Sequence, residues 1–278
     1  MIKICNLLIL IFLSLEVFAA EDFVPIQEKA QGQALAGSMS LNDSLYSNPA
    51  ASSLVSVYSV DGSYSLPKSF AVSVLDTKTS AIGGAIGYFR KTAEQDYFVP
   101  GVSVDNQKFI QGAKVALMGR LSNSLGIGVS GKSIWGPDSQ GKDNRLLDGD
   151  VGAIYNGGFF QFGASLRNVL GGKQVMNFYR EYSLGARLAY EQILSLSVAS
   201  QSKLNSASPY QIGVGAEYVS PYYFSIRGGY RNLLQDQKTF WSMGASFVSP
   251  KLSFHYAVEM PNQPSASPEH MLGTTMLF

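Results

Sequence analysis

The chain has 278 residues, of which 15% are charged and 12% are aromatic, and its formal net charge is +1. This net charge is too small for a protein that binds nucleic acid through its electrostatic field. Two histidines and one cysteine leave almost no residues for a zinc site, a disulfide framework or a Cys/His nucleophile, so we expect no cofactor and no metal. Low charge combined with 28 glycines, 15 tyrosines and 16 phenylalanines favours an all-β protein with an apolar outer surface.

The chain begins with the pattern of a secretory signal peptide, residues 1–19. An apolar stretch from Leu7 to Leu13 follows a basic residue, and small residues precede Ala20, so we predict cleavage between Ala19 and Ala20. Glu16 interrupts the stretch before it reaches the roughly 20 apolar residues of a transmembrane helix. If the remaining chain meets a bilayer, it does so as strands.

Residues 20–53 form an N-terminal segment that is too long and too weakly alternating to be a strand. The part from Gln27 to Ser38 is rich in Ala, Gln and Gly and predicts a short helix before a turn at Asn42-Asp43. This segment therefore stands apart from the strand-rich remainder, residues 54–278.

From about residue 54 onward, apolar side chains recur at every second position, which indicates strands. Leu184, Ala186 and Leu188, for example, alternate with Gly185 and Arg187. The predicted strands are residues 54–66, 69–76, 80–90, 107–120, 125–135, 149–156, 159–168, 180–190, 193–203, 210–219, 223–232, 239–248, 251–259 and 270–278. One face of each strand is apolar and the other is small or polar.

The connections between these strands alternate between short turns and longer polar loops. The short turns are residues 76–80, 122–124, 156–158, 191–192, 220–221 and 249–250. The longer loops are residues 91–106, 136–148, 169–179, 204–209, 233–238 and 260–269. Tight periplasmic turns, longer external loops and an even strand number are typical of outer-membrane barrels, whereas a soluble β-sandwich has shorter strands and gives no reason for the alternation.

Two further features favour a barrel surrounded by outer-membrane lipid. Aromatic residues stand beside the short turns, as an interfacial girdle requires: Tyr155, Tyr190, Tyr218, Tyr222, Tyr223 and Phe247. The amphipathic last strand ends with Gly273, Met276 and Phe278, which resembles the C-terminal signal read by the bacterial barrel-assembly machinery. Met271 stands where that signal prefers a polar residue.

If the apolar face meets lipid, the other face lines the barrel, and its charged residues follow from the alternation. The predicted lumen cations are Lys114, Arg120, Lys132, Arg167, Arg187, Arg227 and Arg231, and the predicted lumen acids are Asp61, Glu217 and Glu259. These cations either attract an anionic ligand such as a fatty-acid carboxylate or pair with acids of neighbouring strands and of the N-terminal segment. The acids available in that segment are Glu21, Asp22, Glu28 and Asp43.

An enzymatic barrel would need a nucleophile, a base and an orienting group. Ser253 and His255 share a face of one strand and are the only candidates, and the sequence identifies no partner to orient them. We therefore expect that the protein is not an enzyme.

Two stretches of sequence resemble a known family. Residues 35–40 (LAGSMS) and 45–51, which contain Asn48-Pro49-Ala50, resemble the N-terminal signature of the FadL-like outer-membrane superfamily, although Ala51 stands where that family usually has Gly. Residues 222–231 (YYFSIRGGYR) resemble a late strand of PorV-like proteins. The superfamily includes long-chain fatty-acid transporters and the PorV-type proteins of type IX secretion. The resemblance implies a 14-stranded antiparallel transmembrane β-barrel whose N-terminal segment folds inward as a plug.

Two functions are compatible with this resemblance. In the first, hydrophobic small molecules pass through the barrel, the plug around Asn48 controls passage, and deletion of residues 20–51 opens a conducting pore. In the second, the barrel is a sealed envelope scaffold or secretion accessory that docks a protein partner. A nonspecific hydrophilic porin is disfavoured by the plug. The loops are shorter than those of the fatty-acid transporters, and loop 91–106, with Tyr97-Phe98-Val99-Pro100, is the best candidate for a small apolar contact.

Overall fold

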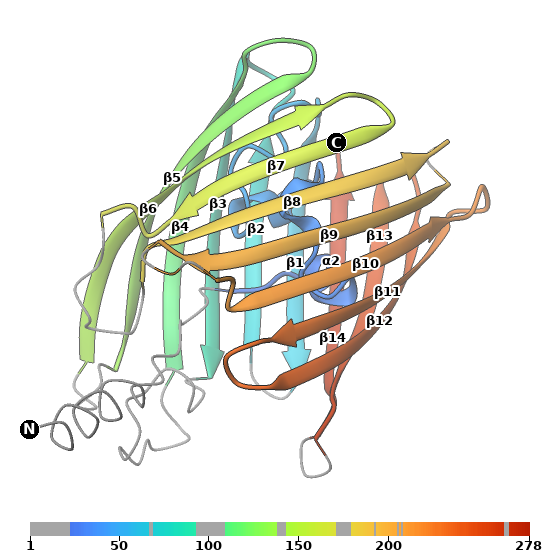
Figure 1. Cartoon of the computed structure of the whole chain (residues 1–278). Helices are drawn as coiled ribbons and strands as arrows, with labels where there is room; N and C mark the ends of the chain where they lie inside the picture. Colours follow the sequence, from blue (N-terminus) through green and yellow to red (C-terminus); the bar gives the residue numbers. More distant parts are fainter. Residues whose placement is uncertain are drawn as a thin grey trace, which may run out of the picture.

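The computed structural model describes residues 23–66, 69–92, 109–137, 143–170, 179–191, 193–204, 206, 208–263 and 267–278. In these ranges fourteen antiparallel strands form one closed barrel, in which each strand pairs with its sequence neighbours and β1 pairs with β14 (Figure 1). The predicted fourteen-stranded antiparallel barrel is confirmed. The predicted cleavage site at Ala19 and Ala20 lies outside the described residues, and so do Tyr97 to Pro100 of loop 91–106.

The strands are β1 (Tyr58–Leu66), β2 (Ser69–Asp76), β3 (Ile82–Thr92), β4 (Phe109–Arg120), β5 (Leu125–Pro137), β6 (Asp143–Asn156), β7 (Phe160–Arg167), β8 (Glu181–Tyr190), β9 (Leu194–Lys203), β10 (Gln211–Val219), β11 (Phe224–Leu233), β12 (Lys238–Val248), β13 (Leu252–Pro261) and β14 (Glu269–Leu277). Most bounds fall within two residues of the predicted ones. β1 begins later than predicted because Val55 turns back to donate to the carbonyl of Ser52. β6 begins earlier because its ladder with β5 continues to the pair Pro137–Asp143.

The short turns lie at one end of the barrel together with the C-terminus (Figure 1). Backbone hydrogen bonds close individual turns, as from Gly157 N–H to Phe160 O (2.8 Å), and join neighbouring turns, as from Asn156 N–H to Ser124 O (2.7 Å). Phe278 N–H donates to Tyr58 O at 2.9 Å, which brings the two ends of the barrel wall together. We call this the turn end of the barrel and the opposite end the loop end.

The outer face of the wall is apolar. Large apolar side chains such as Ile86, Leu117 and Met243 are more than half exposed, although they lie in the middle of their strands. Aromatic side chains collect at the turn end, where the rings of Tyr155 and Phe160 lie 5.6 Å apart between centroids. An apolar band flanked by aromatic residues is the surface that a bilayer requires.

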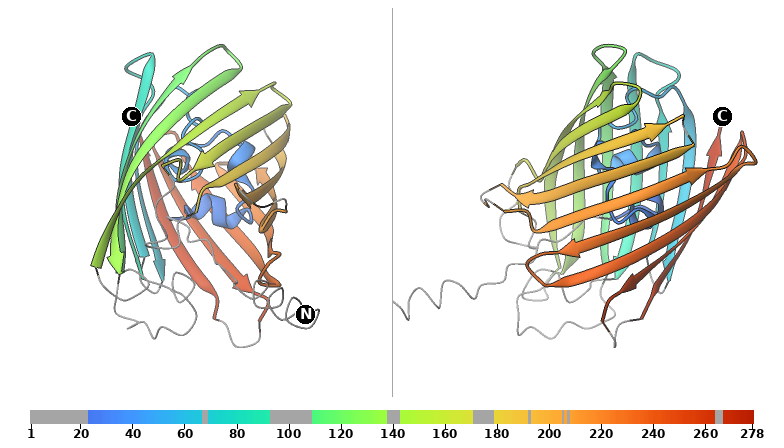
Figure 2. Two further views of the ribbon diagram at one scale, coloured as in Figure 1. Left: turned by 60° about the vertical axis from the view of Figure 1, so that its left-hand side comes forward. Right: turned by 45° about the vertical axis from the view of Figure 1, so that its right-hand side comes forward.

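The described part of the N-terminal segment, residues 23–53, lies inside the barrel (Figure 2). It contains the helix α2 (Ile26–Ala30) and the 3-10 turns η1 (Leu35–Gly37) and η2 (Asn42–Leu45). α2 contacts β11 to β14, η1 contacts β7 to β9, and η2 contacts β1 to β4, so the segment touches most of the wall. No helix in the described ranges is long and apolar enough to span a membrane.

The helix of this segment is shorter than predicted. It ends at Ala30 instead of continuing toward Ser38, because Gly32 (φ 62°) and Gln33 (φ 58°) adopt the left-handed conformation. That conformation ends a helix and is accessible to glycine without steric cost. The chain can therefore turn and follow the inner wall.

Candidate functional site: the barrel interior

Two lysines on the inner wall share one carboxylate. The Nζ atom of Lys114 lies 2.8 Å from Asp150 Oδ2, and that of Lys132 lies 2.9 Å from Asp150 Oδ1. All three side chains are at most 2% exposed. Buried charges are tolerated when they are paired and hydrogen-bonded, so Asp150 is the reason that two lysines can occupy this part of the lumen.

Asp150 also stands where the ladder between β6 and β7 ends. The last pair of that ladder is Val151 with Leu166, so the first half of β6 extends beyond β7. There the Asp150 carboxylate accepts the backbone N–H of Asn168 (3.0 Å) and the Asp148 carboxylate accepts that of Leu170 (2.9 Å). Carboxylates thus take the place of the carbonyl acceptors that a longer ladder would supply.

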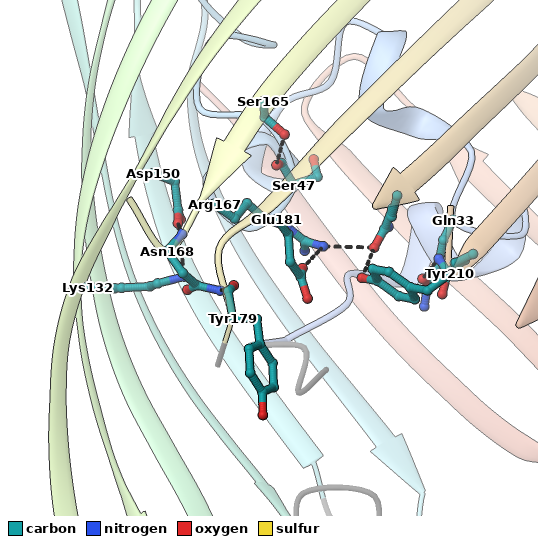
Figure 3. A network of polar contacts seen from close by, with 12 residues as sticks. Gln33, Ser47, Lys132, Asp150, Ser165, Arg167, Asn168, Tyr179, Glu181 and Tyr210 are labelled. Atoms are coloured by element: carbon teal, nitrogen blue, oxygen red, sulfur yellow. Dashed lines mark hydrogen bonds and ion pairs between the residues drawn. The ribbon is translucent and has the colours of Figure 1, made fainter. Parts of the chain in front are cut away.

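A second polar group connects β7, β8 and β9 (Figure 3). One Nη2 atom of Arg167 lies 2.8 Å from both Glu181 Oε2 and Gln201 Oε1, and the hydroxyl of Tyr210 donates to the same Gln201 oxygen at 2.7 Å. Asn168 follows directly and donates from its side chain to the carbonyl of Tyr179 at 2.7 Å. The carboxylate and amide partners of Arg167 Nη2 therefore come from the wall itself.

A chain of polar contacts, which we call the polar belt, follows the inner wall from β8 round to β1. Its members are Arg187, Glu217, Arg227, Ser246, His255, Thr275 and Asp61. Glu217 lies between the two arginines, 3.1 Å from Arg187 and 2.7 Å from Arg227. Arg187 also donates to Ser38 Oγ of the N-terminal segment at 3.2 Å.

The other half of the polar belt contains His255, a buried histidine on the inward face of β13. His255 Nδ1 lies 2.8 Å from Ser246 Oγ, and its Nε2 lies 3.2 Å from Thr275 Oγ1. The Thr275 hydroxyl in turn donates to Asp61 Oδ2 at 2.6 Å. Both ring nitrogens of His255 are thus engaged by hydroxyls other than that of Ser253, the only candidate nucleophile that the sequence places on the same face.

A fourth polar group ties α2 to the last hairpin. Arg231 makes two hydrogen bonds to the carboxylate of Glu259, at 3.0 and 3.1 Å. Lys29 lies 3.8 Å from the same carboxylate and also forms an ion pair with Glu269, which accepts a hydrogen bond from Ser65. Lys29 thereby joins the segment to both strands of the hairpin.

The predicted lumen cations fall into two sets. Those with a carboxylate partner are Lys114, Lys132, Arg167, Arg187, Arg227 and Arg231. Arg120 shares their face but lies at the turn end of β4, where it is exposed and donates to Leu54 O at 3.1 Å. The carboxylates in these six ion pairs belong to the wall. Asp150 was missed as one of them, although its spacing from Gly152 and Ile154 places it on the inner face.

The Asn48-Pro49-Ala50 motif fixes the segment to the wall. The fully buried side-chain amide of Asn48 donates to Ala36 O within the segment and to Ala153 O on β6, both at 3.1 Å. Its oxygen accepts the N–H of Ala50 at 3.0 Å. One side chain therefore holds two parts of the segment and one strand of the wall in register.

Glycines allow backbone-to-backbone contact between the segment and the wall. A Cβ atom on Gly163 or Gly185 would overlap the backbone of Ala36 and Gly37, and one on Gly128 would overlap the carbonyl of Pro49. Removing side chains at these positions lets the segment approach the wall as closely as two strands of a sheet.

Apolar side chains fill the part of the lumen between the segment and β2 to β6. This apolar cluster comprises Phe23, Leu45, Tyr46, Ala71, Leu75, Ala85, Phe89, Ile110, Ala116, Met118, Ile134 and Leu146. The ring of Phe23 lies 5.1 Å from that of Tyr46 and 6.0 Å from that of Phe89, measured between centroids. Ring pairs at these separations are favourable beyond their burial. This cluster was not predicted from the sequence, because Phe23 lies outside the alternating pattern.

Asp43, on η2, is a buried carboxylate whose Oδ2 atom has no hydrogen-bond partner among the described residues. Its neighbour Asn42 is held by Ser59 and Ser73 on β1 and β2, at 2.6 and 3.0 Å. Burial, the nearby carboxylate of Asp61 and then that of Glu28 raise the pKa of Asp43 well above its ordinary value, and Arg227 offsets this only in part.

In the C-terminal strand, the residue that departs from the assembly signal is Met271, and it faces the lumen. Met276 and Phe278 are exposed on the outer face, and the ring of Phe278 packs 5.5 Å from that of Tyr58. Met271 points inward, where it is 2% exposed and packs with Ile26 of α2. The apolar residue at this position therefore contacts the segment.

Comparison with known proteins yields matches of structure alone. No family model matches the chain, and no curated protein matches it. The solved structure of the CymD monoaromatic hydrocarbon channel matches with a TM-score of 0.66 and 11% identity over 93% of this chain and 99% of that one. The Pseudomonas putida toluene transporter TodX matches with a TM-score of 0.66 and 11% identity over 94% and 98%. The Acinetobacter baumannii outer-membrane protein Omp33 matches with a TM-score of 0.50 and 7% identity over 81% and 100%.

These matches share the barrel fold, and the wall of this chain has the apolar exterior and aromatic residues that a membrane requires. The protein is a multi-pass β-barrel of the bacterial outer membrane. Among the described residues no three His, Cys, Asp or Glu side chains gather in a way that would bind a metal.

Proposed function

We propose that this barrel passes small hydrophobic molecules across the outer membrane, with the N-terminal segment acting as a plug. The observation that carries the proposal is the apolar cluster around Phe23, Tyr46 and Phe89, which lies inside the same wall that carries the polar belt and the buried ion pairs. Porin interiors are polar, so an apolar site in the lumen favours an apolar ligand. CymD and TodX, which share the fold, are described as a monoaromatic hydrocarbon channel and a toluene transporter, and this supports the same class of ligand.

Uncharged ligands fit this interior better than fatty acids do. A ligand carboxylate would have to compete with Asp150 for Lys114 and Lys132, or with Glu217 for Arg187 and Arg227. Displacing one partner of a buried ion pair is costly, at about 3–5 kcal/mol. We therefore infer that the lumen cations stabilise the wall and do not steer an anion.

The experiment compares uptake of radiolabelled toluene and of a radiolabelled long-chain fatty acid in cells with and without the protein. A third strain carries a deletion of residues 24–51, which leaves the predicted cleavage site in place. Protein-dependent uptake of toluene that exceeds uptake of the fatty acid supports the proposal. Equal uptake of both compounds with and without the protein would refute it.

A sealed scaffold of the PorV type is the competing proposal, and the close packing of the segment favours it. Contacts between backbones at Gly163 and Gly185 leave no space for a molecule between the segment and that part of the wall. In this case the deletion of residues 24–51 produces ion conductance while the intact barrel takes up neither compound. A protein partner would then be sought at the loop end.

The barrel-assembly machinery is the partner we propose during biogenesis. Met276 and Phe278 lie on the outward face of β14, with Gly273 on the inward face beside Ile26. This alternation is what the assembly signal requires. Replacing Phe278 by a polar residue should lower the amount of folded barrel in the outer membrane without altering barrels already assembled.

A further inference from the structure

Asp43 and Asp61 bring two carboxylates together inside the barrel, one from the N-terminal segment and one from the wall. Asn42, next to Asp43, accepts a hydrogen bond from Ser59 on β1, and Asp61 lies two residues further along β1 on the same inward face. Asp43 is 7% exposed, and its Oδ2 atom has no hydrogen-bond partner in the described part of the chain. A buried carboxylate without a partner is costly when it is charged.

The groups around Asp43 give it little compensation. Glu28 of α2 adds a second negative charge and Arg227 of β11 adds a positive one. Arg227 is already bound to Glu217 and Ser246. Lys114 on β4 lies 5.9 Å from the ring of Tyr46 and is bound to Asp150.

Asp61 is in a different position, because its Oδ2 atom accepts a hydrogen bond from Thr275. Through Thr275 it is connected to His255 and the rest of the polar belt. Asp61 is therefore fixed to the wall, whereas Asp43 moves with the segment. Repulsion between them acts to separate the segment from the wall.

We propose that Asp43 and Asp61 form a proton-operated latch: a proton held by this pair lets the segment sit against β1 and β2, and its loss pushes the segment away. Burial and the neighbouring carboxylates raise the pKa of Asp43, so protonation is favoured in the seated state. A carboxyl whose pKa is raised in the seated state stabilises that state most at pH values below its ordinary pKa, which is 3.8 for Asp43. That stabilisation is lost as the pH rises through the raised value, so the segment is held more weakly at higher pH.

The latch is tested by the accessibility of a buried residue in the segment. The only cysteine of the chain is Cys5, in the predicted signal peptide, so single cysteines are readily introduced. Ser44 is fully buried beside Asp43, and Ser44→Cys reports release of the segment when a membrane-impermeant maleimide labels it in detergent solution. Ser122→Cys, in the exposed turn after β4, is labelled in parallel and corrects for ionisation of the thiol.

The rate for Ser44→Cys, divided by that for Ser122→Cys, should rise between pH 5 and pH 8. One linked proton permits at most about a tenfold rise per pH unit. Asp43→Asn should abolish the rise, because the neutral amide cannot lose a proton, and Asp61→Asn should reduce it. Asp76→Asn, which changes an exposed carboxylate at the turn end, should leave the rise as it is in the unaltered sequence.

A corrected rate that is independent of pH would overturn the latch, as would an unchanged rise in Asp43→Asn. A further control joins Asn42→Cys and Ser59→Cys by a disulfide, which should hold the segment in place and remove the pH dependence without changing either carboxylate. The proposal does not require that the barrel transports hydrophobic molecules. A pH-dependent labelling rate supports the latch even if the cells take up no toluene. Toluene uptake can likewise be observed even if the labelling rate does not depend on pH.

Discussion

Asn48→Ala should release the N-terminal segment while leaving the barrel intact. The substitution removes the donor to Ala36 O, the donor to Ala153 O and the acceptor of Ala50 N–H, all at 3.0–3.1 Å. Each buried hydrogen bond contributes about 1 kcal/mol net, so the seated state should lose about 3 kcal/mol relative to a released segment in which the two internal bonds of Asn48 are also broken. Because 1.4 kcal/mol corresponds to a factor of ten, the released fraction should increase about a hundredfold.

Two measurements check this expectation. The first is maleimide labelling of Ser44→Cys in the presence of Asn48→Ala, and the second is ion conductance of the purified barrel in a planar bilayer. Both should increase, while folding of the barrel, followed by its resistance to unfolding in SDS without heating, should be retained. Asn123→Ala, in an exposed turn, serves as the matched control. If labelling in Asn48→Ala stays within a factor of three of the control, Asn48 does not hold the segment and the reasoning is wrong.

Three other substitutions have expected outcomes. Asp150→Ala should lower the free energy of unfolding by about 3–5 kcal/mol, because Lys114 and Lys132 remain buried without their carboxylate. Denaturant titration in detergent measures this free energy, and a loss below about 1 kcal/mol would contradict the pairing. Gly185→Ala should raise the labelling of Ser44→Cys, since its Cβ atom would overlap the segment, and unchanged labelling would show that the contact can adjust. Asp43→Asn should raise the unfolding midpoint at pH 7 but hardly at pH 2.5, below the ordinary pKa of 3.8, where the carboxylate is protonated in both states; a gain of equal size at the two pH values would show that charge is not the cause.

The strands of the barrel wall could be predicted because the alternation that defines each strand is contained in a short stretch of sequence. Every strand alternates between lipid and lumen, so a period of two in the sequence indicates both the strand and its two faces. Leu184, Ala186 and Leu188 show this, and the buried Lys114 and Arg227 followed from the same alternation. The bounds of β6 were less predictable, because its first residues pair with β5 alone and carry a mixture of charges.

The contents of the lumen were less predictable because their contacts join residues far apart in sequence. Nothing near Phe23 indicates that its ring meets that of Phe89, and nothing near Asp150 indicates that it serves two lysines on different strands. The sequence supplied the acids and bases, and the closed sheet determined which of them meet. The resemblance around Asn48 indicated an inward fold for the segment, but it did not indicate which strands hold it.

The docking surface of α2 has a consequence for the order of assembly. Ile26 and Ala30 pack on Ala257 and Met271, which belong to the last two strands of the chain. Lys29 likewise has its partners on that final hairpin. The residues synthesised first among those described are thus among the last to acquire their native neighbours. A nascent barrel that lacks its C-terminal hairpin would lack both the apolar surface and the carboxylates that hold α2, so seating of this helix marks completion of the wall.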